Sequence, residues 1–226
     1  MSKILIISDT HRNHDLLKIV LERNQDCEYL IHLGDEPDDL EFYPELIENM
    51  QVFFVYGLYH ERFLEQNAVN CFNIGELEFC ISHSEKKLRQ IANDKSQMTN
   101  STKPIGDCHY ERVRFLCFGH THHSYFKQIG GDVWLNPGHL KLPKDRDEIA
   151  GYAVVEFNDD KDCRQDVCVP SQLDCRQDVC VPSQLDCGQD VCVPSQLDYR
   201  QDVCVPSIQV KFYDFNGNII KSEAVK

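Results

Sequence analysis

The sequence contains no long apolar run. The apolar stretch Ile4-Leu5-Ile6-Ile7 is too short for the hydrophobic region of an export signal, and no cleavage site follows it. No other segment approaches the roughly 20 apolar residues that a membrane-spanning helix needs. We therefore expect a cytoplasmic protein with no membrane partner.

Positive charge is scarce. Lysine and arginine number 23 against 37 aspartates and glutamates, which gives a formal net charge of −14, and no segment is rich in basic residues. Nonspecific binding of nucleic acid depends on neutralising phosphates with basic side chains, so we expect no nucleic-acid partner. The acidic balance is instead compatible with divalent cations. No feature of the sequence defines an oligomeric state.

Cysteine is abundant, with 12 residues, but its distribution argues against a disulfide scaffold. Seven of the cysteines fall within one repeated segment, and the other five are scattered, mostly among apolar neighbours: Cys27, Cys71, Cys80, Cys108 and Cys117. Because there is no export signal, we expect these five to be reduced and to pack as small hydrophobic side chains.

The repeated segment begins CRQDVCVPSQLD at residues 163–174 and recurs with a period of 12 up to residue 207. Each unit offers few side chains to bury, and its proline interrupts strand pairing, so the pattern favours a flexible insert. Stacked short strands, a thiol or metal-binding role, and self-association through the Val/Cys stretches are the alternatives.

Strand patterns flank this insert at 151–157 and 208–215, and an Asn216-Gly217 turn follows the second. We therefore predict one domain built from residues 1–160 and 208–226, with 161–207 inserted at a hairpin tip, where insertions cost little.

The remaining chain predicts an α/β fold. Apolar runs indicate strands at 3–8, 29–33, 52–56, 114–118, 125–129 and 133–136, and a hairpin over 71–82. Helical spacing or composition indicates helices at 15–23, 38–48 and 84–93, whereas 94–109 has no pattern and is expected to be loop. Strands alternating with helices, then consecutive hairpins, predict a mixed sheet with helices outside.

Carboxylates and imidazoles follow the predicted strands where each one ends. The candidate metal ligands are Asp9, His11, Asp35, His83, His120 and His122. Ligands of open α/β sheets gather beyond the carboxyl ends of the strands. Carboxylates mixed with imidazoles suit manganese, iron, zinc or nickel, and six ligands exceed the four of a structural zinc, so the set predicts a pair of ions.

The other polar side chains near these strand ends have a weaker case. Apart from Asp35, the acidic run at 35–39 is expected to be a solvated helix start. The remaining histidines are expected at the surface or behind the site: His14, His32, His109, His123 and His139.

These motifs resemble those of the calcineurin-like metallophosphoesterases, particularly the small bacterial and archaeal phosphodiesterases; the superfamily includes a retromer subunit of the same fold. The matching segments are Asp9/His11, Gly34-Asp35, His83 and Gly119-His120-Thr121-His122, and Leu135-Asn136-Pro137-Gly138 also matches, with His139 in place of a serine. The resemblance implies a sandwich of two mixed β-sheets flanked by helices.

The resemblance also implies a chemistry: a metal-dependent phosphodiesterase or phosphatase that activates water between two ions, manganese foremost, for in-line attack on a small phosphate ester. Asp9, His11 and His122 would hold one ion, His83 and His120 the other, and Asp35 would bridge them.

One motif departs from the family pattern. Where the family has G-N-H-D/E, this chain reads Gly57-Leu58-Tyr59-His60-Glu61, so the asparagine ligand of the second ion is missing. His60 would then serve as the acid for the leaving group or as a replacement ligand. The competing hypothesis is a catalytically weakened or inactive scaffold for protein interaction.

Overall fold

The computed structural model describes residues 1–93, 113–145, 148–158 and 207–225. The predicted loop at 94–109, Cys108 and nearly all of the predicted insert lie outside these residues. None of the described helices is long and apolar enough to span a membrane.

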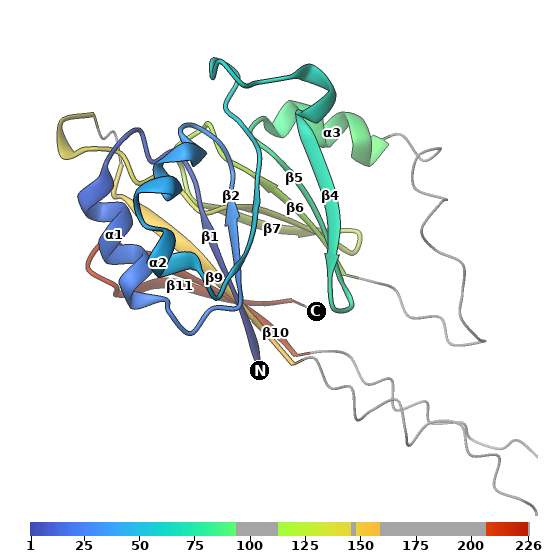
Figure 1. Cartoon of the computed structure of the whole chain (residues 1–226). Helices are drawn as coiled ribbons and strands as arrows, with labels where there is room; N and C mark the ends of the chain where they lie inside the picture. Colours follow the sequence, from blue (N-terminus) through green and yellow to red (C-terminus); the bar gives the residue numbers. More distant parts are fainter. Residues whose placement is uncertain (94–112, 146–147, 159–206, 226) are drawn as a thin grey trace, which may run out of the picture. The chain divides into compact units, whose positions relative to one another are not determined.

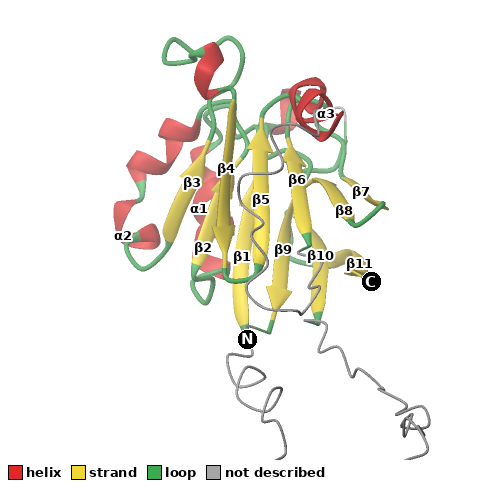
Figure 2. Ribbon diagram, turned by 90° about the vertical axis from the view of Figure 1, so that its right-hand side faces the viewer, coloured by secondary structure: helices red, strands yellow, loops and turns green. Residues whose placement is uncertain are grey.

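The described strands form two sheets. The first has the order β11-β10-β9-β1-β2-β3 and the second the order β4-β5-β6-β8-β7 (Figures 1 and 2). The strands are β1 Ser2–Ile7, β2 Tyr29–His32, β3 Gln51–Phe54, β4 Val69–Ile74, β5 Leu77–Ser82, β6 Arg114–Phe118, β7 Tyr125–Ile129, β8 Asp132–Asn136, β9 Gly151–Phe157, β10 Ile208–Asp214 and β11 Ile219–Val225. The α-helices are α1 His14–Arg23, α2 Pro44–Ile47 and α3 Glu85–Asn93, and 3₁₀ helices span Pro37–Phe42, Glu65–Asn67 and Pro143–Asp145.

Both sheets are mixed, which confirms the predicted two-sheet α/β fold. Strand β1 pairs parallel to β2 and antiparallel to β9, and β6 pairs parallel to both β5 and β8. The parallel strands β1, β2 and β3 therefore end along one edge of the first sheet, and β5, β6 and β8 end along one edge of the second. The loops that follow these strands carry the candidate site.

The main core lies between the two sheets. Ile6 and Val155 of the first sheet belong to the same buried cluster as Phe79 and Phe115 of the second. A row of stacked rings crosses between the sheets from Phe53 through Phe72 and Phe79 to Phe115. The burial of apolar side chains from both sheets is the dominant favourable contribution to this packing.

The helices cover the outer faces (Figures 1 and 2). The apolar face of α1 carries Leu17, Val20 and Leu21 at helical spacing and packs on the outward side chains of β1. Helix α3 buries only Leu88, which belongs to a smaller cluster on the outer face of the second sheet.

The predicted helix at 38–48 is wrong in detail. The segment forms the 3₁₀ helix Pro37–Phe42 and then the short α2, which begins at Pro44. A proline disfavours helical geometry in the residue before it, and Tyr43 accordingly has φ −134° and ψ 52°.

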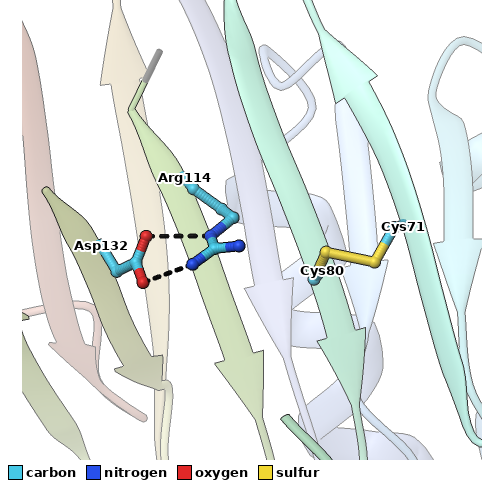
Figure 3. The surroundings of a disulfide bond; sticks show 4 residues. All are labelled: Cys71, Cys80, Arg114 and Asp132. Atoms are coloured by element: carbon cyan, nitrogen blue, oxygen red, sulfur yellow. Dashed lines mark hydrogen bonds and ion pairs between the residues drawn. A yellow bond between two sulfur atoms is a disulfide. The ribbon is translucent and has the colours of Figure 1, made fainter. Parts of the chain in front are cut away.

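Two of the cysteines also differ from expectation. Cys71 and Cys80 lie opposite each other on β4 and β5 and form a disulfide, and Cys71 is exposed (Figure 3). Cys27 and Cys117 are free and buried, as predicted. The expectation of reduced, buried thiols is therefore wrong for the β4–β5 pair.

The register of β9 and β10 bears on the predicted insert. Phe157, the last residue of β9, pairs with Ile208, the first residue of β10. The two ends of the intervening segment therefore leave the sheet side by side. This supports the proposed division at 161–207, which stays a prediction.

Candidate metal centre

The loops after β1, β2 and β6 contain residues in an uncommon backbone conformation. Within the described residues, all seven non-glycine positions with positive φ fall in three loops, and five are candidate ligands: Asp9, His11, Asp35, His120 and His122. Residues other than glycine seldom adopt a positive φ, and backbone strain of this kind is concentrated at functional sites. The backbone is therefore shaped to aim these side chains.

Four of the predicted ligands meet at one point. Asp9, His11, Asp35 and His122 each offer a ligand atom, and these atoms all lie within 4.8 Å of one another. His122 Nε2 is 3.3 Å from Asp9 Oδ1, and His11 Nε2 is 3.4 Å from Asp35 Oδ2. The arrangement joins the ends of β1, β2 and β6.

Asp9 is buried, and only one of its two carboxylate oxygens has a hydrogen-bond partner among the described residues. Its Oδ2 accepts hydrogen bonds from the Ser8 hydroxyl and from the His120 backbone N–H. Its Oδ1 and His11 Nε2 are both buried without a hydrogen-bond partner among the described residues. Orphaned polar atoms of this kind are rare in native proteins, and a divalent cation between them would satisfy both. These residues therefore fit a metal ion.

The second predicted half of the site lies on the other side of Asp35. His83 Nε2 is 3.4 Å from Asp35 Oδ1, and the His83 ring packs edge-on against His120 at 5.0 Å. His83 Nδ1 donates to the Leu33 carbonyl at 2.8 Å, so a neutral ring presents the lone pair of Nε2 to the site. Asp35 thus faces an imidazole with each of its two oxygens.

The electrostatics of the two carboxylates differ. Burial alone would raise the pKa of Asp9, but the neighbouring imidazoles of His122 and His83 and the hydrogen bond from Ser8 outweigh burial and hold that pKa below its usual value. Burial raises the pKa of Asp35; His83 opposes this rise, and the nearby Asp9 adds to it. A cation between them would favour ionisation of both.

Glycines are required where the loops cross behind these side chains. A Cβ at Gly57 would lie 1.9 Å from Asp35 Oδ1 and 2.9 Å from the Asp35 backbone nitrogen. A Cβ at Gly34 would lie 2.5 Å from His83 Nδ1. The glycines of the motifs therefore serve close approach as well as turning.

His60 does not join the four-residue cluster. Its Nδ1 accepts a hydrogen bond from the Arg62 backbone N–H at 3.1 Å, and its ring stacks on Tyr56 at 4.5 Å. A neutral His60 therefore carries its proton on Nε2, which lies 3.6 Å from Asp38 Oδ2. Tyr59 is 94 % exposed and does not take the place of the missing asparagine.

Sequence reasoning missed Asp39, which was expected to be solvated and is 4 % exposed. Its Oδ2 accepts from the Thr10 hydroxyl at 2.7 Å and from the Arg12 backbone N–H at 2.9 Å, and its Oδ1 lies 3.0 Å from His14 Nε2. It therefore braces the loop on both sides of His11. Similarly, Asn136 donates to the Gly119 carbonyl and to the Thr121 hydroxyl, which holds the loop between His120 and His122.

Replacing Asp39 with asparagine should loosen the His11 loop, because a carboxamide cannot accept all of these bonds. We expect the free energy of unfolding of the metal-free protein to fall by about 1–3 kcal/mol. Metal affinity should fall by about 10- to 100-fold. Urea unfolding and metal titration measure the two effects.

The exposed Asp26, which pairs with Lys3, provides the control: Asp26→Asn should change neither quantity appreciably. Unchanged metal affinity in Asp39→Asn would contradict the bracing role.

The chain is similar in sequence to known proteins of one family. Residues 2–160 match the calcineurin-like phosphoesterase superfamily domain. A probable metallophosphoesterase of Mycoplasma genitalium is 26% identical over 162 residues, which covers 71% of this chain and 91% of that protein. The probable metallophosphoesterase YsnB of Bacillus subtilis is 23% identical over 158 residues, which covers 70% of this chain and 85% of that protein.

Solved structures show the same fold. The E. coli phosphoesterase YfcE has a TM-score of 0.54 at 15% identity and covers 99% of this chain and 100% of its own. The zinc complex of Vps29 from Entamoeba histolytica has a TM-score of 0.52 at 16% identity and covers 99% of this chain and 98% of its own. By its domain match and its fold, the chain belongs to the calcineurin-like phosphoesterase superfamily.

Proposed function

We propose that this protein is a metal-dependent phosphodiesterase or phosphatase that hydrolyses a small phosphate ester at a dinuclear centre. The observation that carries the proposal is the position of Asp35. Its Oδ2 faces His11 and its Oδ1 faces His83, each at 3.4 Å, which is the arrangement of a carboxylate that bridges two ions.

The residues divide into two groups around that bridge. Asp9, His11 and His122 would hold one divalent ion, and His83 with His120 would hold the other. Manganese is the first candidate, and zinc, iron and nickel suit the same ligands. Two such ions would supply a nucleophilic water at neutral pH and positive charge opposite the phosphoryl oxygens.

His60 would act as the acid for the leaving group. Its side chain is 11% exposed, and its Nε2 lies 3.9 Å from Glu36 Oε2 and 3.6 Å from Asp38 Oδ2. The turn that carries His60 starts at Gly57, whose backbone lies against Asp35. The proton donor would therefore lie on the same turn as Gly57, with its Nε2 beside Glu36 and Asp38.

The alternative function is a scaffold of reduced or no activity. The observation that favours it is the second half of the site, where Leu58-Tyr59 supplies no carboxamide and Tyr59 points into solvent. The pairing of His83 with Asp35 nevertheless leaves two imidazoles and a carboxylate there. The cytoplasmic location and the absence of nucleic-acid partners stay predictions.

Metal removal distinguishes these functions. Purified protein should contain about two ions per chain and should hydrolyse bis(p-nitrophenyl) phosphate or p-nitrophenyl phosphate. Chelation should abolish turnover, and added manganese should restore it, because the nucleophilic water depends on the ions. Metal analysis by mass spectrometry and the colour of released p-nitrophenol measure the two quantities. One ion or none, with no turnover under any metal, would instead support the scaffold.

A further inference from the structure

Strand β11, Ile219–Val225, forms an open edge of the first sheet. It stands first in the order β11-β10-β9-β1-β2-β3, and among the described residues only β10 pairs with it (Figure 2). With seven residues it is longer than the other edge strands β3, β4 and β7, which have four, six and five. A long edge presents backbone N–H and C=O groups that can accept a further strand.

This edge is exposed and partly apolar. Ile219 is 56% exposed and Ile220 is 51% exposed. The pairing of β11 with β10 is regular from Val225 to Lys221, and the irregularity in register comes after Lys221. The regular section can therefore receive another strand in ordinary antiparallel register.

The order of charges along the edge selects the strand that fits it. The side chains of Lys221 and Glu223 lie on the same face, with Nζ 3.1 Å from Oε1, and they are 45% and 37% exposed. If two copies of β11 pair antiparallel about Ser222, Lys221 of each copy lies opposite Glu223 of the other. Opposite charges in this position stabilise a strand pair, and like charges destabilise it. The pairing therefore contains two attractive contacts.

The neighbouring registers of the same pair are unfavourable. Centring the pair on residue 221 places two lysines opposite each other, and centring it on residue 223 does the same with two glutamates. Charges on an edge strand also disfavour an added strand that lacks the matching pattern. The sequence of β11 therefore favours a second copy of itself in one register.

We propose that β11 pairs with β11 of a second copy of this chain, so that the first sheet continues through a two-fold axis at Ser222. Such a contact uses the same surface on both copies and closes as a dimer. In this register Ile220 lies opposite Ala224 of the second copy, so pairing also removes apolar surface from water. The contact uses none of the candidate metal ligands and does not depend on the proposed function.

Charge reversal tests the register. Sedimentation velocity of the full chain over a range of protein concentrations should show a monomer–dimer equilibrium, and non-reducing gels should show that no disulfide joins the copies. Glu223→Lys turns both attractive contacts into repulsive ones and should raise the dimer Kd by about 10- to 100-fold. Lys221→Glu should have a similar effect. The double variant Lys221→Glu/Glu223→Lys restores opposite charges and should regain most of the wild-type affinity.

Two controls separate strand pairing from surface charge and from folding. Glu22→Lys makes the same charge reversal on α1, where Glu22 lies 3.9 Å from Lys18 and both side chains are 52% exposed, and it should leave the dimer Kd unchanged. Urea unfolding of each variant as a monomer should match the wild type. A wild type that is monomeric at every concentration, a Glu223→Lys dimer of wild-type affinity, or a double variant as weak as Glu223→Lys would each overturn the inference.

Discussion

Replacing Asp35 with asparagine should lower kcat/KM for p-nitrophenyl esters by at least about 10³-fold. One oriented group that stabilises the transition state is worth about 10²–10³, and this carboxylate faces both halves of the site. The metal content of the purified variant should fall below two ions per chain. Steady-state kinetics and metal analysis on the same sample measure the two effects.

The same substitution should not destabilise the metal-free fold. Burial and the neighbouring Asp9 raise the pKa of Asp35 above its unfolded value, so its contribution to stability is full at low pH and is lost as pH rises through the folded pKa. At neutral pH the ionised carboxylate therefore works against the metal-free fold. Metal-free Asp35→Asn should be at least as stable to urea at pH 7 as the wild type.

Asp132, the first residue of β8, provides a matched control. Asp132 has a side chain 23 % exposed, close to the 21 % of Asp35, and forms a two-pronged pair with Arg114 (Figure 3). Asp132→Asn should lower the free energy of unfolding and leave metal content and turnover intact. Full activity in Asp35→Asn, or a loss of activity in Asp132→Asn equal to that in Asp35→Asn, would contradict a bridging role for Asp35.

The convergence of the candidate ligands could be predicted because it follows from strand direction. Parallel strands end at one edge of a sheet, so residues that directly follow β1 and β2 must lie near each other. Asp9 and Asp35 are such residues, and the structure places both in one cluster. The proximity of His83 and His120 follows in the same way from β5 and β6.

The surroundings of the ligands could not be predicted in this way. Asp38 and Asp39 are adjacent and chemically alike, but one lies near the surface and the other is buried under Thr10 and Arg12. Which carboxylate turns inward depends on the 3₁₀ helix that replaces the expected α-helix.

The pairing of Cys71 with Cys80 could have been predicted from the sequence. The hairpin was predicted over 71–82, and a two-residue turn at Gly75-Glu76 pairs Ile74 with Leu77. Counting outward by strand register places Cys71 opposite Cys80. The expectation of reduced thiols rested on compartment alone and overlooked this geometry.

Buried His32 should make the fold sensitive to acid. Its side chain is fully buried on β2, and burial lowers the pKa of His32 to about 4 from its usual 6.5. Above pH 6.5 neither state binds this proton, and the contribution to stability is complete. Between pH 6.5 and 4 the unfolded chain binds the proton and the folded chain does not, so stability falls as pH falls. The loss attributable to this residue is about 3 kcal/mol.

The variant His32→Asn isolates this effect. Its side-chain oxygen can replace His32 Nδ1 as the acceptor for the Gly34 N–H, and it does not titrate. Urea unfolding of the metal-free proteins at pH 7 and pH 4 should show a smaller loss of stability in the variant, by about 3 kcal/mol. Metal-free protein is required because protons compete with cations for the neighbouring ligands. Equal losses in the two proteins would mean that His32 gains access to a proton in the folded state, and the β2 end would then have to open locally at low pH.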